Sequence, residues 1–208
     1  MISLLDCTLR DGGFVNDWNF GYDNLVNIFE RLVDSGVDMI EVGLLDERMP
    51  FDINRSIMPN TQSVNNIYGH LDKKKSKIVA MIDYGTCSLS NIQPANETCI
   101  DAIRVIFKKP KYKEALNFCE EIKKKGYYVF AQLVSVTSYS DEDIMSFIAL
   151  ANKIKPYAVS MVDTYGLMHQ DNLKHYFDLL NEYLDPEIKI GYHGHNNFQM
   201  GYANCISM

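Results

Sequence analysis

The stretch that decides the fold runs Ile2-Ser3-Leu4-Leu5-Asp6-Cys7-Thr8-Leu9-Arg10-Asp11-Gly12-Gly13. Its short apolar beginning predicts a β-strand over residues 2–6, which leads directly into polar residues and two glycines. The turn is not Gly-x-Gly-x-x-Gly, the phosphate-binding pattern that usually follows the first strand of an open, doubly wound sheet. The residues after this strand therefore do not indicate a phosphate-binding turn, and their polar side chains are candidates for another kind of functional site.

Short apolar runs and amphipathic helical stretches alternate along the rest of the chain. The expected strands are Ile2–Asp6, Asp38–Gly43, Lys77–Ile82, Ala102–Phe107, Tyr127–Val134, Tyr157–Val162 and Lys189–His193. The expected helices are Tyr22–Asp34, Ser63–Leu71, Tyr112–Lys125, Glu142–Lys153 and a segment from Gln170 or Asp171 to Leu184. Short strands without polar alternation suit a parallel sheet that is covered on its outside.

Seven such units in series leave two fold classes open, an open doubly wound sheet and a TIM (β/α)8 barrel. A barrel predicts polar functional residues at the C-terminal ends of several strands. The chain has them at five places: Arg10-Asp11, Glu41, Asp83, Asp163-Thr164, and His193 with His195. We therefore expect a barrel, and one domain over residues 1–208.

A complete barrel of this kind needs about 250 residues, so we expect this one to be truncated after strand 7. The edges of strands 1 and 7 would then be exposed. We expect them to be covered by another chain, by contact between copies in a homo-oligomer, or by disorder.

Composition excludes several classes of protein. The 208 residues are 47% hydrophobic and carry a net charge of −7, which is unsuited to a nucleic-acid surface. Five widely spaced cysteines without a Cys-x-x-Cys pair predict neither disulfides nor a cysteine zinc site, and favour the reducing cytoplasm. No apolar run resembles a signal peptide or approaches the roughly 20 residues of a membrane span.

His193-Gly194-His195 is the clearest candidate metal site. Residues i and i+2 of a strand point to the same face, so two imidazoles can bind one ion. In a barrel, strands 1 and 7 are separated only by strand 8, which makes Asp11 the natural carboxylate ligand. An ordinary pair of histidines at a strand end, one solvated and one hydrogen-bonded, is the alternative.

Arg10 and Asp11 project differently although they are neighbours. Asp11 can ligate a metal while Arg10 offers fixed hydrogen-bond donors to a substrate oxygen. Glu41 is either a substrate contact or a buried carboxylate paired with Arg10. Asp6 and Thr8 are expected to be internal hydrogen-bond partners.

Asp-x-Thr-Leu-Arg-Asp-Gly near the start and His-x-His about 180 residues later resemble the DRE-TIM metallolyase superfamily. This superfamily includes 4-hydroxy-2-oxoacid aldolases, 3-hydroxy-3-methylglutaryl-CoA lyase, 2-isopropylmalate and homocitrate synthases, and pyruvate carboxyltransferase domains. Glu41-Val42-Gly43 and Asp163-Thr164-Tyr165-Gly166 are similar as well. The resemblance extends from residue 1 to the end of the chain.

The resemblance implies a role for each residue. Asp11, His193 and His195 would bind Mg²⁺ or Mn²⁺, Arg10 would stabilise an enolate oxygen, and Thr164 would hold a substrate carboxylate. The implied activity is that of an aldolase that cleaves or forms a carbon–carbon bond next to a 2-oxo acid. Aldolases of this group often work with a dehydrogenase that takes the aldehyde product.

Two alternatives to the aldolase stay open. One is an acyl-CoA lyase or condensing synthase, and the other is a non-catalytic metal-binding fragment. Gly201-x-Ala203-Asn204 is similar to the hydroxy-oxoacid aldolases. However, no histidine follows Arg-Asp-Gly where those aldolases have their proposed base, so the base is left to Asp17, Asp83 or a residue outside this chain.

Overall fold

The computed structural model describes residues 2–208. Its strands are β1 (Leu5–Asp6), β2 (Met39–Leu45), β3 (Ile57–Met58), β4 (Lys77–Asp83), β5 (Ala102–Phe107), β6 (Tyr128–Leu133), β7 (Ala158–Asp163) and β8 (Lys189–Gly194). Its α-helices are α1 (Thr8–Asp11), α2 (Gly13–Asn16), α3 (Tyr22–Ser35), α4 (Thr61–Tyr68), α5 (Tyr112–Lys124), α6 (Asp141–Ile154), α7 (Gln170–Tyr183) and α8 (Gly201–Ser207). Short 3₁₀ turns cover Leu89–Asn91, Ala95–Glu97, Lys109–Lys111 and Val136–Ser138.

The sheet has the strand order of a barrel. The order is β1-β2-β4-β5-β6-β7-β8, and the short β3 pairs with β2 away from this path. The strands follow the chain without a reversal, whereas a doubly wound sheet has a point at which the order reverses. The fold is therefore the part of a (β/α)8 barrel that runs from its first strand to its seventh, as the sequence predicts.

The described residues group into two compact units, each with its own core. The first contains the chain up to Arg104 together with Glu121–Tyr128, and the second contains Val105–Glu120 and Val129–Met208. The expectation of one domain over residues 1–208 stays a prediction.

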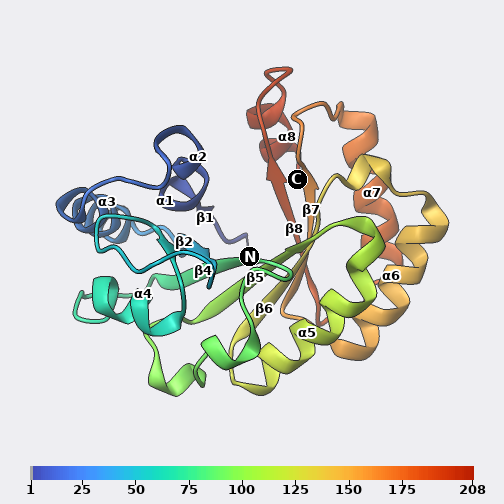
Figure 1. Cartoon of the computed structure of the whole chain (residues 1–208). Coiled ribbons are helices and arrows are strands. Elements are labelled where there is room, and N and C mark those ends of the chain that lie inside the picture. The colour runs from blue at the N-terminus through green and yellow to red at the C-terminus, as the bar shows by residue number, and fades with distance from the viewer. Residues whose placement is uncertain (1) are drawn as a thin grey trace. The chain divides into compact units, whose positions relative to one another are not determined.

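In the first unit, β2 and β4 are buried along almost their whole length. Helix α3 contributes Leu25, Phe29 and Val33 to the core, spaced four residues apart so that they lie on one face of the helix. The helix ends at Gly36, whose φ of 79° is a left-handed conformation that glycine adopts without strain. Figure 1 shows α3 and α4 among the first elements of the chain.

In the second unit, β7 is buried at every position, and α6 and α7 lie side by side (Figure 1). Ser140 caps α6: its hydroxyl accepts the Asp143 N–H at 3.2 Å, and the Asp143 carboxylate accepts the Ser140 N–H at 2.9 Å. The last strand, β8, is only half-buried. Its register with β7 pairs Val162 with His193.

The first strand differs from the prediction. It covers only Leu5–Asp6 instead of residues 2–6, and Ile2 and Leu4 are exposed. The sequence predicted Arg10 and Asp11 at the end of the strand. They lie instead in the short helix α1 that follows it. The reason is local: Cys7 C=O accepts the N–H groups of Arg10 and Asp11 at 3.1 and 2.7 Å, which curls the chain into a turn.

Candidate functional site

The candidate residues lie in both units. Arg10, Asp11 and Glu41 belong to the first unit, and Thr164, His193 and His195 belong to the second. Within the first unit, Arg10 forms ion pairs with both Asp11 and Glu41. Within the second, the rings of His193 and His195 meet edge-on, with centroids 4.9 Å apart.

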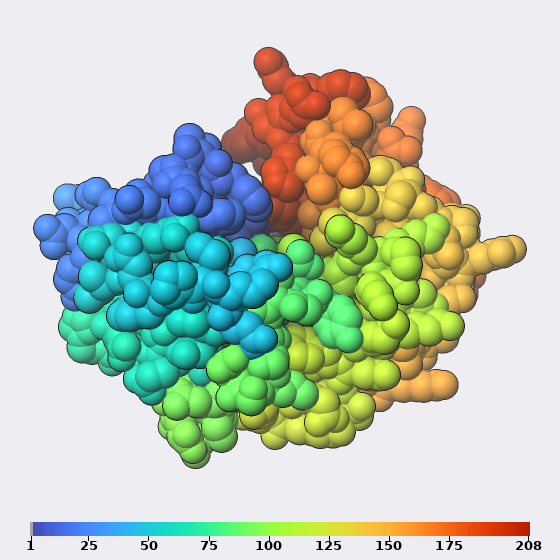
Figure 2. All heavy atoms as spheres, viewed as in Figure 1, coloured from blue at the N-terminus to red at the C-terminus, as the bar shows by residue number. Residues whose placement is uncertain are grey.

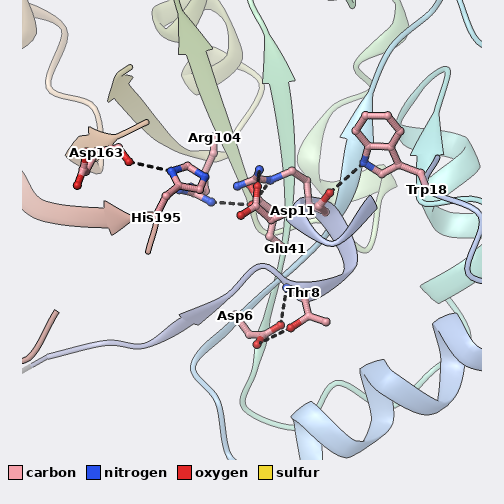
Figure 3. A network of polar contacts seen from close by, with 9 residues as sticks. Asp6, Thr8, Asp11, Trp18, Glu41, Arg104, Asp163 and His195 are labelled. Atoms are coloured by element: carbon pink, nitrogen blue, oxygen red, sulfur yellow. Dashed lines mark hydrogen bonds and ion pairs between the residues drawn. The ribbon is translucent and has the colours of Figure 1, made fainter. Parts of the chain in front are cut away.

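Residues just before Arg10 set the turn that presents it. The Asp6 carboxylate accepts the Thr8 N–H at 2.9 Å and the Thr8 hydroxyl at 3.1 Å. These bonds satisfy a donor at the start of α1, which has no earlier carbonyl to bind. Asp6 and Thr8 are therefore internal hydrogen-bond partners, which confirms their predicted role (Figure 3).

The glycines after Arg-Asp allow a close approach by the indole of Trp18. A Cβ on Gly13 would lie 2.0 Å from Trp18 Cδ1, so no larger residue fits there without moving the ring. The Trp18 Nε1–H donates to the Arg10 carbonyl at 2.9 Å (Figure 3). The indole thus fixes the backbone at Arg10.

The segment between Gly13 and Trp18 lies at the surface of its unit, in the blue region of Figure 2. Phe14 and Val15 are 69% and 92% exposed, respectively. The structure therefore does not pack these two side chains into the core of the first unit.

Arg10 is the centre of a buried ionic cluster. Its side chain is 6% exposed, its Nε–H donates to Glu41 Oε2 at 2.8 Å, and its Nη1 pairs with Asp11. Glu41 is fully buried in β2 and also accepts Arg104 Nη1 at 2.7 Å (Figure 3). Of the two roles considered for Glu41, the structure shows the pairing with Arg10, and contact with a substrate stays a prediction.

The charges of this cluster influence the groups around it. Burial opposes the charged form of Arg10, but the carboxylates of Glu41 and Asp11 outweigh it and raise the pKa of its guanidinium. Burial, followed by the charge of Glu41, raises the pKa of the Cys7 thiol to about 11. Cys7 is therefore a neutral thiol at pH 7 and not a nucleophile.

Asp163 fixes the orientation of His195 in the second unit. His195 Nδ1 lies 2.8 Å from the carbonyl oxygen of Asp163 (Figure 3). A carbonyl can only accept, so Nδ1 carries the hydrogen and the neutral ring keeps its lone pair on Nε2. This is the arrangement that metal-binding histidines commonly have.

The turn after β7 is built on the same aspartate. Its buried carboxylate accepts the N–H groups of Leu167 and Met168, each at 3.0 Å. The next residue, Thr164, accepts the Ser135 N–H at 2.8 Å with its hydroxyl oxygen. A hydroxyl can both accept and donate, so this contact leaves Thr164 the capacity to donate to a ligand.

The two alternative bases lie in different surroundings. The Asp17 side chain is 80% exposed and pairs with Arg55 at 2.9 Å, which ties it to the segment before β3. Asp83 is half-buried and is the last residue of β4.

Two contributors were absent from the sequence prediction. Arg104 is the single charge in the apolar strand β5, and a buried charge implies a buried partner, so it could have been recognised. The Asp163 carbonyl has no comparable signal, because any residue supplies a carbonyl and only the folded turn aims it at His195.

Comparison with known proteins identifies the family. The family model described as HMGL-like matches residues 1–207. The chain belongs to the HMGL-like family. The resemblance to the metallolyases is thereby confirmed at the level of the family.

The chain is similar to proteins of several names. It is 24% identical over 99% of its length to 4-hydroxy-2-oxovalerate aldolase 2 of Comamonas testosteroni, of which it covers 59%. It is 22% identical over 98% of its length to the oxaloacetate decarboxylase of Mycobacterium tuberculosis, and again covers 59%. The chain thus spans about three fifths of the length of these relatives.

Solved structures show the same fold. Hydroxymethylglutaryl-CoA lyase from Pseudomonas aeruginosa matches with a TM-score of 0.76 and 15% identity, covering 99% of this chain and 72% of the lyase. At this identity the likeness concerns the fold alone. Among the described residues, no helix combines the length and the apolar character that crossing a membrane requires.

Proposed function

We propose that this chain forms the catalytic site of a divalent-metal-dependent carbon–carbon lyase of the aldolase type, acting on a 2-oxo acid. The observation that carries the proposal is the buried Arg10 guanidinium, which is held on two flanks by the carboxylates of Glu41 and Asp11. A preorganised cation is most effective where negative charge develops during a reaction.

We infer that Asp11, His193 and His195 hold the metal ion. The hydrogen bond that orients His195 and the neighbouring ring of His193 support this role, because the nitrogens of neutral imidazole rings are common ligands of divalent metal ions. Two imidazoles and one carboxylate suit Mn²⁺ better than Mg²⁺, which prefers oxygen ligands. When bound, the ion would polarise the 2-oxo group of the substrate as a Lewis acid.

Names of relatives support a shared chemical step. 4-Hydroxy-2-oxovalerate and oxaloacetate are both 2-oxo acids, and cleavage of the bond between C3 and C4 leaves the enolate of pyruvate in each case. In the aldol cleavage the C4 hydroxyl loses its proton, the bonding electron pair passes to the enolate, and C3 is then protonated. In the decarboxylation the same electron pair stays with C3 and forms the enolate, C4 leaves as CO₂, and C3 is then protonated.

The residues of this chain would act on two neighbouring groups of the substrate, the 2-oxo group and the carboxylate beside it. Arg10 donates to the oxygen at C2, where the enolate charge develops, and Glu41 keeps the guanidinium in place. The Thr164 hydroxyl donates to the substrate carboxylate. No side chain is assigned as the base.

The similarity to the oxaloacetate decarboxylase of M. tuberculosis favours decarboxylation as a second candidate activity. Arg10 would have the same role in it, because both reactions pass through the pyruvate enolate. Decarboxylation needs no base for a C4 hydroxyl, which fits a chain that has Phe14 and no histidine just after Arg-Asp-Gly-Gly.

The test measures pyruvate formed from each substrate by the Mn²⁺-loaded protein. We expect Arg10→Met to lower kcat by roughly 100-fold or more, the size of effect seen when one preorganised donor is lost. Arg48→Met is the matched control, because Arg48 is an exposed arginine paired with Asp46, and it should leave kcat unchanged. Acetyl-CoA release from an acyl-CoA substrate instead of pyruvate formation would assign the chain to the acyl-CoA lyases. Unchanged turnover in Arg10→Met would contradict the proposed role of Arg10.

A further inference from the structure

Arg104 is the buried charge that the proposed mechanism does not yet use. It lies in the middle of β5, whose sequence is otherwise apolar, and its side chain is 4% exposed. Such a charge is costly in a core unless an opposite charge lies within hydrogen-bond distance. The partner is Glu41 on β2, whose side chain is fully buried.

The two arginines meet at a single atom. Glu41 Oε2 accepts Arg10 Nε at 2.8 Å and Arg104 Nη1 at 2.7 Å. The position of Arg10 therefore depends on a carboxylate oxygen that Arg104 also holds. The three residues come from α1, β2 and β5, so the contact links three separate elements.

A count of charges shows what Arg104 contributes. Arg10 alone would face two carboxylates, those of Glu41 and Asp11, leaving a net charge of about −1 in a largely buried place. Arg104 brings these four side chains to neutrality before a metal ion binds. Glu41 Oε2 is then shared between two guanidinium groups.

Different nitrogens of the Arg10 guanidinium pair with the two carboxylates. Its Nε pairs with Glu41 and its Nη1 with Asp11. A guanidinium clamped through Nε and Nη1 still presents the hydrogens of Nη2 in a fixed direction.

We propose that Arg104 is a positioning residue, which acts through Glu41 to aim Arg10 at an anionic oxygen of the ligand. The proposal rests on the proposed function, since it requires a 2-oxo acid or a similar chelating dianion at this site. In this role Arg104 acts on the ligand through Glu41 Oε2, to which its Nη1 donates.

Binding of oxalate, a planar dianion that resembles the pyruvate enolate, provides the test. Oxalate is titrated by calorimetry into Mn²⁺-saturated wild type, Arg104→Met, Glu41→Gln and the double variant. We expect each single variant to weaken oxalate binding by roughly tenfold, a value within the coupling range of contacting charged groups. The double variant should bind no more weakly than Glu41→Gln alone, and the dissociation constant for Mn²⁺ should stay the same throughout.

A matched control separates positioning from a general loss of ion pairs. Lys73→Met removes the partly buried pair with Asp101 in the same unit, and it should leave oxalate binding unchanged. Arg104→Lys keeps the charge but not the shape of the guanidinium, so it should weaken oxalate binding less than Arg104→Met.

Each other outcome overturns a defined statement. Unchanged oxalate binding in Arg104→Met, or losses that multiply in the double variant, would overturn the positioning role while leaving the proposed function intact. Failure of Mn²⁺-saturated wild type to bind oxalate would overturn both. Failure of both Arg104→Met and Arg104→Lys to fold would assign Arg104 a structural role instead.

Discussion

Asp163 accepts hydrogen bonds with both its side-chain carboxylate and its backbone carbonyl, and each binds a different segment of the second unit. Its carboxylate accepts the N–H groups of Leu167 and Met168, and its carbonyl accepts His195 Nδ1–H. An asparagine has only one accepting oxygen, so Asp163→Asn must lose one of the two bonds that close the turn. We expect the dissociation constant for Mn²⁺ to rise roughly 10-fold to 100-fold, because His195 loses its fixed orientation.

Isothermal titration of Mn²⁺ measures this effect. Asp143→Asn is the control, because it makes the same chemical change at the N-terminus of α6 in the same unit. It should leave the affinity for Mn²⁺ unchanged. Equal affinities in Asp163→Asn and the wild type would show that the turn does not control His195.

Single residues could be predicted where the type of residue and its place in the pattern agree. The pairing of Arg10 with Glu41 is confirmed, since a glutamate inside an apolar strand requires a positive partner. Arg104 carries the same signal, but the register of strands far apart in sequence decides that it reaches the same oxygen. The metal ligands and Thr164 remain predictions.

At the scale of elements, strand positions follow from apolar runs with clear ends. Ala102–Phe107 is predicted with the same bounds as β5, and Lys77–Ile82 differs from β4 by one residue. The short β3 has no signal of its own, because a two-residue strand shows no periodicity. It depends on Gly43 of β2, where a Cβ would lie 2.0 Å from the Ser56 carbonyl oxygen.

The start of α6 gives a prediction that depends on pH. A hydrogen bond from Lys109 and the N–H and hydroxyl of Ser140 lower the pKa of Asp143 to about 2, from an ordinary value of 3.8. A folded pKa below the unfolded one stabilises the protein above the unfolded value, and this stabilisation is lost as the pH falls through the folded value.

Wild type should therefore be more stable than Asp143→Asn at pH 7, and the difference should shrink between pH 3.8 and about 2. Urea unfolding at a series of pH values measures it. Ser140→Ala removes the other half of the capping box and should cost about 1 kcal/mol at neutral pH. A difference between wild type and Asp143→Asn that does not depend on pH would show that the charge of Asp143 contributes nothing.

For the whole molecule, the sequence pattern was enough to predict the fold class and, with it, the order of the strands. Short parallel strands alternating with helices predict a barrel or an open sheet, and the absence of a phosphate-binding turn after the first strand favours the barrel. The observed strand order and the structural relatives agree with that choice. The division into two compact units has no counterpart in composition, because both halves of the chain alternate strands and helices alike.

Binding of the proposed metal ion by Asp11, His193 and His195 should stabilise the folded chain. An ion that binds only the folded chain stabilises it by about 2.7 kcal/mol at 100 times its dissociation constant. For a chain of this size, Mn²⁺ should then raise the Tm by roughly 5–10 °C, and a chelator should reverse the rise.

Variants that remove one proposed ligand each test whether the rise in Tm comes from this metal site. Asp11→Ala and His193→Ala should each abolish the Mn²⁺-dependent rise in Tm, because either change leaves an incomplete set of ligands. His175→Ala is the control, since this histidine pairs with Asp141 in the second unit, and it should retain the full rise. A rise that persists in Asp11→Ala but disappears in His193→Ala would show that Asp11 is not a ligand of the ion.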